Sequence, residues 1–167
     1  MYIVFDKTGT LTTGKFTVTN FTLSPTASID ETTFKQIAFS LEKYANHPIA
    51  NAIAAAWKIK EDIRWQKIEE QKGLGMFATD KEGNTYWAGS YKIVADPSTE
   101  DGHNIYVQKN NQLIGWIDVA DQIRPEAKEV VEQLHRQVIT TILLSGDRKE
   151  KCRLVGEALG IQQIISE

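Results

Sequence analysis

The 167-residue sequence has a single cysteine, Cys152. One thiol can form neither an intrachain disulfide nor a metal cluster of several thiolates, so both are excluded within this chain. The sequence also lacks any run of the roughly 18 to 20 consecutive apolar residues that a membrane-spanning helix needs. The apolar stretch at residues 1–5 is too short for a signal peptide. We therefore expect a soluble piece of a longer protein, in a reducing, cytosolic setting.

A strong excess of charge of either sign is absent as well. The 19 Lys and Arg residues nearly balance the 22 Asp and Glu residues, for a formal net charge of -3. This balance gives no general electrostatic reason to bind nucleic acid or an anionic membrane surface, and we expect no nucleic-acid partner. The chain is 41% hydrophobic and 25% charged, which is typical of a globular protein with one ordinary domain or two small ones.

The two ends of the sequence share a pattern of buried strands and helices. The apolar run 2–5 leads into the string DKTGT, and the run 138–144 leads into Ser145-Gly146-Asp147. Such runs are typical of parallel strands that end in functional loops. Helical spacing begins at Pro125 and again at 148, with Gly160 as a stop. These ends predict an α/β domain.

The middle of the sequence follows a different pattern. Residues 15–23 alternate like a strand, and two helices are expected, from Asp30 to about 45 and from Pro48 to about 59. Turn signals then separate strand-like stretches at 65–71, 76–79, 85–88, 105–108 and 113–119. We predict an α+β insert at 15–118, an antiparallel sheet flanked by helices, within an α/β domain formed by 1–14 and 119–167.

Asp6 opens the most informative string, DKTGTLT at 6–12. An aspartate at the carboxyl end of a parallel strand lies where loops supply N–H donors to phosphate oxygens. Its carboxylate can attack a phosphoryl group to form an acyl phosphate. Gly9 permits a tight loop, and Lys7 and Thr8 can donate to the phosphate. An isolated aspartate here would more often be a capped turn, but the whole string favours the catalytic interpretation.

This string resembles the phosphorylation motif of P-type ATPases, which have a haloacid-dehalogenase-like fold. The resemblance implies that ATP phosphorylates Asp6 and that Asp6 and Thr8 contribute to Mg²⁺ binding, with ATP and Mg²⁺ as cofactors. Small phosphatases of this fold generally carry a second aspartate two residues after the nucleophile, for acid–base catalysis. Thr8 occupies that position here, which favours the longer-lived phosphoaspartate that a pump requires.

His47 lies in the string NHPI, and its position before Pro48 biases it out of helical conformation. Its imidazole is then expected at a helix mouth, free to meet a ligand. The string resembles the Ser-Glu-His-Pro-like motif of heavy-metal P-type ATPases, whose histidine orients the adenine. In that family a glutamate five residues earlier contacts the base, and Glu42 has this spacing. A surface histidine and a solvated helix glutamate are the simpler alternatives.

Gly73 and Gly75 open the string GLGMFA, and their lack of a Cβ permits close approach to a base or to phosphates. The string superficially fits a dinucleotide-binding fingerprint, but the residues after it alternate like a strand where that motif needs a helix. The resemblance assigns these glycines to the nucleotide site. It also aligns Gly89 and Ser90 with a Gly-Asn pair of the family, from which Ser90 departs.

The segment DQIRPE at 121–126 resembles the point where the family's chain re-enters the phosphorylation domain. Ser145-Gly146-Asp147 resembles a Thr-Gly-Asp loop whose hydroxyl binds the transferred phosphoryl group, and serine keeps that hydroxyl. The resemblance thus assigns catalytic roles to Asp6, Lys7, Thr8, Ser145, Gly146 and Asp147. The family's later lysine and Gly-Asp-Gly-x-Asn-Asp segment are expected beyond 167, so we expect an incomplete Mg²⁺ site and no sustained turnover.

Three functions are open at this point. The first is the ATP-binding cytoplasmic region of a heavy-metal pump in the cell membrane, with ATP or ADP and the transmembrane and actuator domains as partners. The second is a small haloacid-dehalogenase-like phosphohydrolase, which Thr8 disfavours. The third is a non-catalytic nucleotide-binding module. The identity of the metal, the direction of transport and the oligomeric state are not encoded in these residues.

Overall fold

The chain divides into two compact units in a computed structural model that describes residues 1–96 and 98–166. Unit 1 comprises Met1–Lys15 together with the chain from Asp121 onward, and unit 2 comprises Phe16–Ala120. The units are defined by their packing alone. The assignment of a phosphorylation domain to 1–14 and 119–167 and of a nucleotide-binding domain to 15–118 therefore stays a prediction about function.

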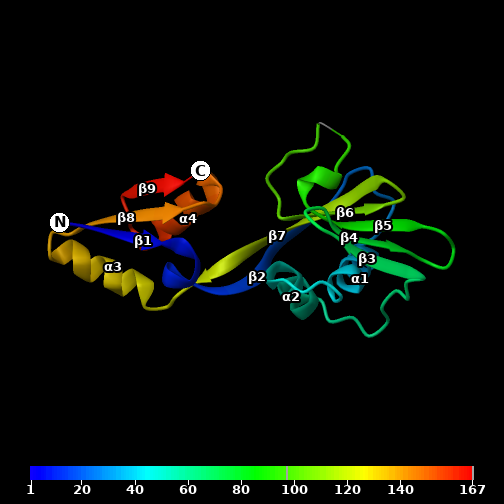
Figure 1. The fold of residues 1–167 in the computed structure, drawn as a ribbon, viewed down its shortest axis with the longest axis horizontal. Coiled ribbons are helices and arrows are strands. Elements are labelled where there is room, and N and C mark those ends of the chain that lie inside the picture. The colour runs from blue at the N-terminus through cyan, green and yellow to red at the C-terminus, as the bar shows by residue number, and fades with distance from the viewer. Residues whose placement is uncertain (97, 167) are drawn as a thin grey trace. The chain divides into compact units, whose positions relative to one another are not determined.

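Unit 1 contains a parallel sheet of three strands in the order β1-β8-β9 (Figure 1). Its elements are β1 (Tyr2–Asp6), a tight turn η1 (Lys7–Leu11), α3 (Ala127–Arg136), β8 (Thr140–Ser145), α4 (Lys149–Leu159) and β9 (Gln163–Ser166). The buried core joins Leu143 of β8 to Val131 of α3 and to Cys152 and Leu159 of α4. One face of the sheet therefore packs against both helices.

The other face of this sheet carries exposed apolar side chains. Successive residues of a strand point to opposite faces, so the neighbours of the buried residues share the second face. Tyr2, Val4, Leu144 and Ile165 are 68%, 55%, 47% and 55% exposed. Unit 1 is thus covered on one side of its sheet only, within the described part of the chain.

Two elements of unit 1 begin two residues later than the sequence predicts. Helix α3 begins at Ala127 because Pro125 lies in a turn in which the N–H of Ala127 donates to the carbonyl of Arg124. Strand β8 begins at Thr140 because Val138, with φ of 59°, closes the end of α3 through a hydrogen bond to His135. Gly160 ends α4 in the left-handed conformation, as expected.

Unit 2 is built on a sheet of six strands in the order β2-β7-β6-β5-β4-β3, antiparallel from β3 through β7. The strands are β2 (Thr12–Leu23), β3 (Lys67–Gln71), β4 (Gly75–Thr79), β5 (Thr85–Gly89), β6 (Ile105–Lys109) and β7 (Gln112–Ile123). This is the antiparallel insert that the sequence predicts. The long strands β2 and β7 each include residues of both units.

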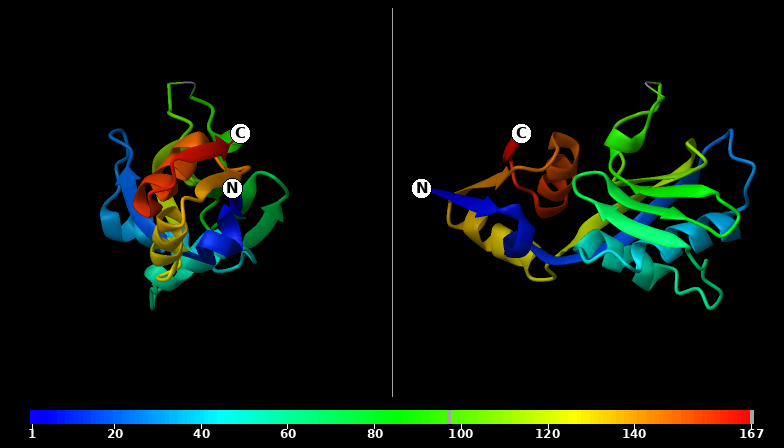
Figure 2. Two further views of the ribbon diagram at one scale, coloured as in Figure 1. Left: turned by 90° about the vertical axis from the view of Figure 1, so that its left-hand side faces the viewer. Right: turned by 45° about the vertical axis from the view of Figure 1, so that its right-hand side comes forward.

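Helices α1 (Glu31–Glu42) and α2 (Pro48–Ala56) cover one face of this sheet (Figure 2). The carboxylate of Asp30 caps α1 by accepting from the N–H of Thr33 at 2.8 Å. The segment that includes the short helix η2 (Tyr91–Ile93) lies on the opposite face. Both long helices are about three residues shorter than expected, since α1 gives way to a turn in which Ala45 N–H donates to the Glu42 carbonyl. No helix in the described residues is long and apolar enough to cross a membrane.

Candidate functional site

The first candidate site lies at the carboxyl ends of β1 and β8. Parallel pairing sets Asp6 opposite Leu144, so the loops that follow the two strands are neighbours. Lys7, which is 5% exposed, forms an ion pair between its Nζ and Oδ2 of Asp147. Asp6 and Thr8 are exposed, while Ser145 is half-buried and its Oγ accepts from the N–H of Asp147 at 3.2 Å. Both predicted catalytic strings thus meet at one edge of the sheet of unit 1.

Hydrogen bonds hold the shape of the loop after Asp6. Gly9 has φ of 82°, a conformation that glycine adopts without strain. Its carbonyl accepts from Nη2 of Arg124 at 2.9 Å, and its N–H donates to Oγ1 of Thr12 at 3.3 Å. The loop is therefore fixed from the segment that precedes α3.

Asp121 positions the loop after Asp6, a role that the sequence analysis did not assign to it. Its Oδ2 lies 2.5 Å from Oγ1 of Thr12, and its Oδ1 accepts from the N–H of Gly14 at 2.9 Å. The Thr12 hydroxyl also lies 3.0 Å from the carbonyl oxygen of Lys7. The available signal was the DQIRPE string, which contains both Asp121 and Arg124.

This edge can support chemistry at a phosphoryl group. It presents an exposed carboxylate, the hydroxyls of Thr8 and Ser145, and a buried cation, Lys7. Among the described residues, no three His, Cys, Asp or Glu side chains cluster as a metal site would require. The oxygen donors of Asp6 and Thr8 suit Mg²⁺ as part of a ligand set, with the remaining positions open to water and phosphate oxygens.

The second candidate site is a hollow of about 250 Å³ in unit 2. All six residues that the sequence predicts for nucleotide binding line it, namely Glu42, His47, Gly73, Gly75, Gly89 and Ser90. The sequence analysis missed its other lining residues, which are Ala45, Glu70, Gln71, Leu74, Met76, Ala88, Asn104 and Ile105. Leu74 and Met76 belong to the GLGMFA string, whereas no motif marks the others. We call this cavity the glycine hollow.

Gly75 and Gly89 make room for each other rather than for a ligand alone. They are paired across β4 and β5. A Cβ on Gly75 would lie 2.2 Å from the carbonyl oxygen of Ala88, and one on Gly89 would lie 1.9 Å from the carbonyl oxygen of Leu74. The sequence analysis explained the close approach at Gly75 by a bound base or phosphate, whereas the structure shows that two strands approach there. Gly73, by contrast, has open space around it.

Ser90 links the two glycine segments. Its N–H donates to the carbonyl of Leu74 at 2.8 Å, and its Oγ donates to the carbonyl of Gly73 at 3.1 Å. These bonds fix the strand connection that forms one wall of the glycine hollow. Ser90 therefore has a structural role although it departs from the Gly-Asn pattern.

His47 caps helix α2. It has extended backbone, as its position before Pro48 predicts, and its Nδ1 accepts from the N–H of Ala50 at 3.3 Å. Accepting at Nδ1 assigns the proton of the neutral ring to Nε2. The sequence predicted an imidazole that is free to meet a ligand, but in the structure its Nδ1 is engaged. Nε2–H is the donor that remains for a ligand.

Glu42 is the least usual residue of the glycine hollow. It is 2% exposed, and its Oε2 has no hydrogen-bond partner among the described residues. Burial raises the pKa of this carboxyl to about 8, and the nearby charge of Glu70 acts in the same direction. Glu42 is therefore mostly protonated at neutral pH.

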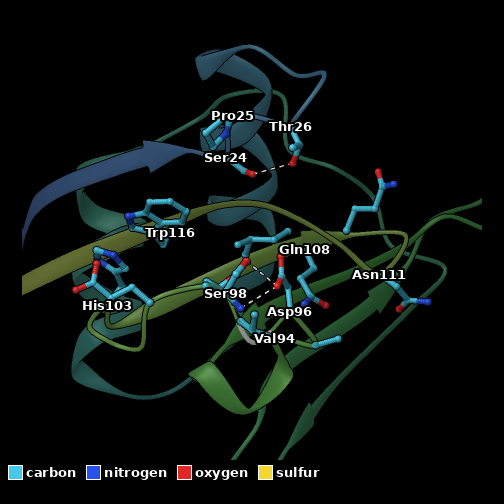
Figure 3. Close-up of a pocket in the computed structure, with 15 residues that line it drawn as sticks. Ser24, Pro25, Thr26, Val94, Asp96, Ser98, His103, Gln108, Asn111 and Trp116 are labelled. Carbon is cyan, nitrogen blue, oxygen red and sulfur yellow. Dashed lines mark hydrogen bonds between the residues drawn. The ribbon is translucent and has the colours of Figure 1, made fainter.

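A larger hollow of about 580 Å³ lies elsewhere in unit 2 (Figure 3). It contains none of the predicted site residues, and several of its polar groups bond to one another. Asp96 accepts from both the N–H and the Oγ of Ser98, at 2.9 and 2.7 Å, and the Ser24 and Thr26 hydroxyls lie 3.0 Å apart. Size alone therefore does not identify a ligand site here. Oε2 of Glu42, which has no partner in the described part of the chain, favours the glycine hollow.

Comparison with known proteins supports this arrangement. A family model described as haloacid dehalogenase-like hydrolase matches residues 1–167, and the chain belongs to that family. The homologues of this chain are metal-transporting P-type ATPases. It is 32% identical over 99% of its length to the zinc-transporting ATPase of Bacillus subtilis (strain 168), and 34% identical over 96% to the copper-exporting P-type ATPase B of Enterococcus hirae. It spans 28% and 23% of those relatives.

Solved structures agree in fold. The catalytic domain of the CPx-ATPase CopB-B, described with conformational changes upon nucleotide binding, matches 99% of this chain with a TM-score of 0.80 and 28% identity. This chain covers 61% of that domain. A zinc-transporting PIB-type ATPase matches in fold with a TM-score of 0.78 at 23% identity. These findings confirm the haloacid-dehalogenase-like fold and the resemblance to heavy-metal P-type ATPases.

Proposed function

We propose that this chain is the ATP-binding cytoplasmic part of a heavy-metal-transporting P-type ATPase. In this proposal residues 15–118 bind ATP or ADP, and residues 1–14 and 119–167 carry Asp6, the residue that ATP phosphorylates. The observation that carries it is that all six predicted nucleotide residues line one hollow. The parent pump lies in a membrane and uses the phosphoaspartate to drive a metal cation across it. Relatives named for zinc, cadmium and copper leave the metal open.

The glycine hollow supplies the contacts for the base. Glu42 offers a buried carboxyl whose Oε2 has no partner among the described residues, and His47 offers Nε2–H at the start of α2. The Cβ position of Gly73 is open, so this part of the wall leaves room for the ligand. These groups address the base more than the phosphates, so ATP and ADP should bind with similar affinity.

The edge of β1 and β8 supplies the groups for phosphoryl transfer. A carboxylate oxygen of Asp6 forms a bond to the γ-phosphorus while the bond between that phosphorus and the β–γ bridging oxygen breaks, and ADP leaves. Lys7, Thr8 and the Ser145 hydroxyl stabilise charge on the phosphoryl oxygens, and removing one such group typically lowers rates by about 10²–10³. Asp6 and Thr8 would supply part of the ligand set of Mg²⁺, which would neutralise further phosphate charge when bound.

Calorimetric titration with ATP and with ADP tests the proposal. Glu42→Ala and His47→Gln should each weaken binding, the first by roughly ten- to a hundredfold, because a lost hydrogen bond to a charged or buried group costs about 1.5–3 kcal/mol. Glu61→Ala is the matched control, since Glu61 is exposed and lies outside the hollow. Unchanged affinity in both site variants would remove the pocket assignment.

A screen of phosphate esters separates this proposal from a small phosphohydrolase. Thr8 stands where such enzymes have an acid–base aspartate, so we expect little turnover of general phosphate esters. Robust turnover without preference for ATP would favour the phosphohydrolase instead.

A further inference from the structure

Glu42 is built into the wall of the glycine hollow as the last residue of α1. The carboxyl end of a helix carries partial negative charge, which disfavours a second negative charge beside it. The side chain is nearly fully buried and its Oε2 lacks a partner among the described residues. A buried polar atom without a partner is costly, and a ligand with a complementary group would relieve that cost.

The charged groups around Glu42 do not favour its ionised form. Strand β3 presents Glu70, whose charge is of the same sign, and the segment before α2 presents His47. The lining residues from β4, β5 and β6 are uncharged. Lys43, the next residue in the chain, is engaged in an ion pair with Asp62. No Lys or Arg among the described residues lines the hollow, so burial keeps the carboxyl protonated.

The protonation state decides which ligand edge Glu42 can bind. A neutral carboxylic acid presents one O–H donor beside one C=O acceptor, whereas a carboxylate presents acceptors only. Adenine carries its N6 amino donor next to a ring nitrogen acceptor. The neutral acid therefore matches both groups of adenine, but the carboxylate would set an acceptor against the ring nitrogen.

We propose that Glu42 binds the base as a neutral carboxylic acid, so that its proton is part of the binding site for an aminopurine nucleotide. The inference rests on the proposed function and deepens it. It adds that binding depends on pH through one side chain of the hollow, and that the ligand class has an amino donor adjacent to a ring nitrogen acceptor.

The sign of the pH dependence follows directly. The pKa of Glu42 is about 8, so the proton needed for binding is present at neutral pH and is lost as the pH rises above that value. Each pH unit above the pKa lowers the protonated fraction, and with it the apparent affinity, about tenfold. Glutamine presents the same donor and acceptor without titrating, so Glu42→Gln reproduces the neutral acid at every pH.

The test is titration of the whole chain with ADP between about pH 7 and pH 9.5, for the wild type, Glu42→Gln and Glu70→Gln. We expect the wild type to lose about tenfold in affinity from pH 7 to pH 9. Glu42→Gln should bind like the wild type at pH 7 and keep that affinity at pH 9. In Glu70→Gln the loss of affinity should begin at lower pH. The charge of Glu70 raises the pKa of Glu42, so removing that charge lowers this pKa.

Two outcomes would overturn the inference while leaving nucleotide binding intact. One is a wild-type affinity that is flat across this range, and the other is a Glu42→Gln affinity that falls in parallel with the wild type. An absence of ADP binding by the folded wild type at pH 7 would instead remove the proposed function together with this inference. Circular dichroism at each pH verifies that the chain stays folded.

Discussion

The two units of this chain differ in how their sheets are covered. The six-stranded sheet of unit 2 has α1 and α2 on one face and the η2 segment on the other. The three-stranded sheet of unit 1 packs against α3 and α4 on one face, and its other face exposes Tyr2, Val4 and other apolar side chains. Unit 2 thus holds its candidate site within a covered core, whereas polar contacts hold the loops of unit 1.

The difference indicates that packing of the sheet forms the candidate nucleotide site, whereas side-chain contacts shape the candidate phosphorylation site. In the glycine hollow, strand packing leaves space and buries a carboxyl. At the β1 and β8 edge, the contacts of Lys7, Asp121 and Arg124 set the loop geometry. Regions with less buried core open at lower free energy. We therefore expect unit 1 to unfold before unit 2.

The largest expected effect comes from a matched pair of core cavities. Leu143 in unit 1 and Ile117 in unit 2 are both fully buried, so Leu143→Ala and Ile117→Ala should each cost about 2–5 kcal/mol. All four tryptophans lie in unit 2, so their fluorescence during urea unfolding reports on that unit. Ile117→Ala should lower the urea midpoint of the fluorescence transition. Leu143→Ala should lower only the midpoint of an earlier transition, which circular dichroism detects. Equal fluorescence shifts would mean that the units unfold as one.

A second prediction concerns the pH dependence of unit 2. The pKa of Glu42 is raised from 4.5 to about 8 on folding, so the protonated form stabilises the fold. That stabilisation is complete below about pH 4.5 and is lost as the pH rises through about 8, for a total of about 5 kcal/mol. The fluorescence-detected free energy of unfolding should fall over this range in the wild type, relative to Glu42→Gln. Parallel curves for the two proteins would show that Glu42 is ionised in the fold.

A third prediction compares two glycines of the same wall. Gly75→Ala places a Cβ 2.2 Å from the Ala88 carbonyl oxygen, so it should destabilise unit 2 by about 2–3 kcal/mol. Gly73→Ala meets only the penalty of its positive φ, about 1 kcal/mol, because apart from its chain neighbours no heavy atom of the described residues lies within 4 Å of the added Cβ. Urea unfolding followed by fluorescence measures both. A larger effect at Gly73 would contradict the account of strand approach.

The smallest effect is expected at Asp121. Asp121→Asn replaces one carboxylate acceptor shared by Thr12 and Gly14, which should cost about 1–2 kcal/mol in unit 1. Glu132→Gln is the control, because its pair with Arg136 is exposed and should be worth at most about 0.5 kcal/mol. The dichroism phase of unit 1 should shift for Asp121→Asn alone. A shift in fluorescence would place the effect in unit 2 instead.

Much of the secondary structure followed from local pattern. The strand before Asp6, the cap at Asp30 and the stop at Gly160 are set by residues close in sequence, and the structure confirms them. The starts of α3 and β8 were wrong by two residues, because contacts of Arg124 and the positive φ of Val138 decide them. Local propensity does not contain those contacts.

By itself, the sequence determined the family resemblance, the two groups of candidate residues and the order of the elements, because motifs and periodicity are local properties of a chain. Only the tertiary structure showed that Gly75 and Gly89 face each other and that Asp121 holds the loop after Asp6. It alone also showed that Glu42 is buried, which raises the pKa of its carboxyl, and that its Oε2 has no hydrogen-bond partner among the described residues. Burial and partner atoms arise from residues distant in sequence, so the charge state of a side chain is decided by the fold.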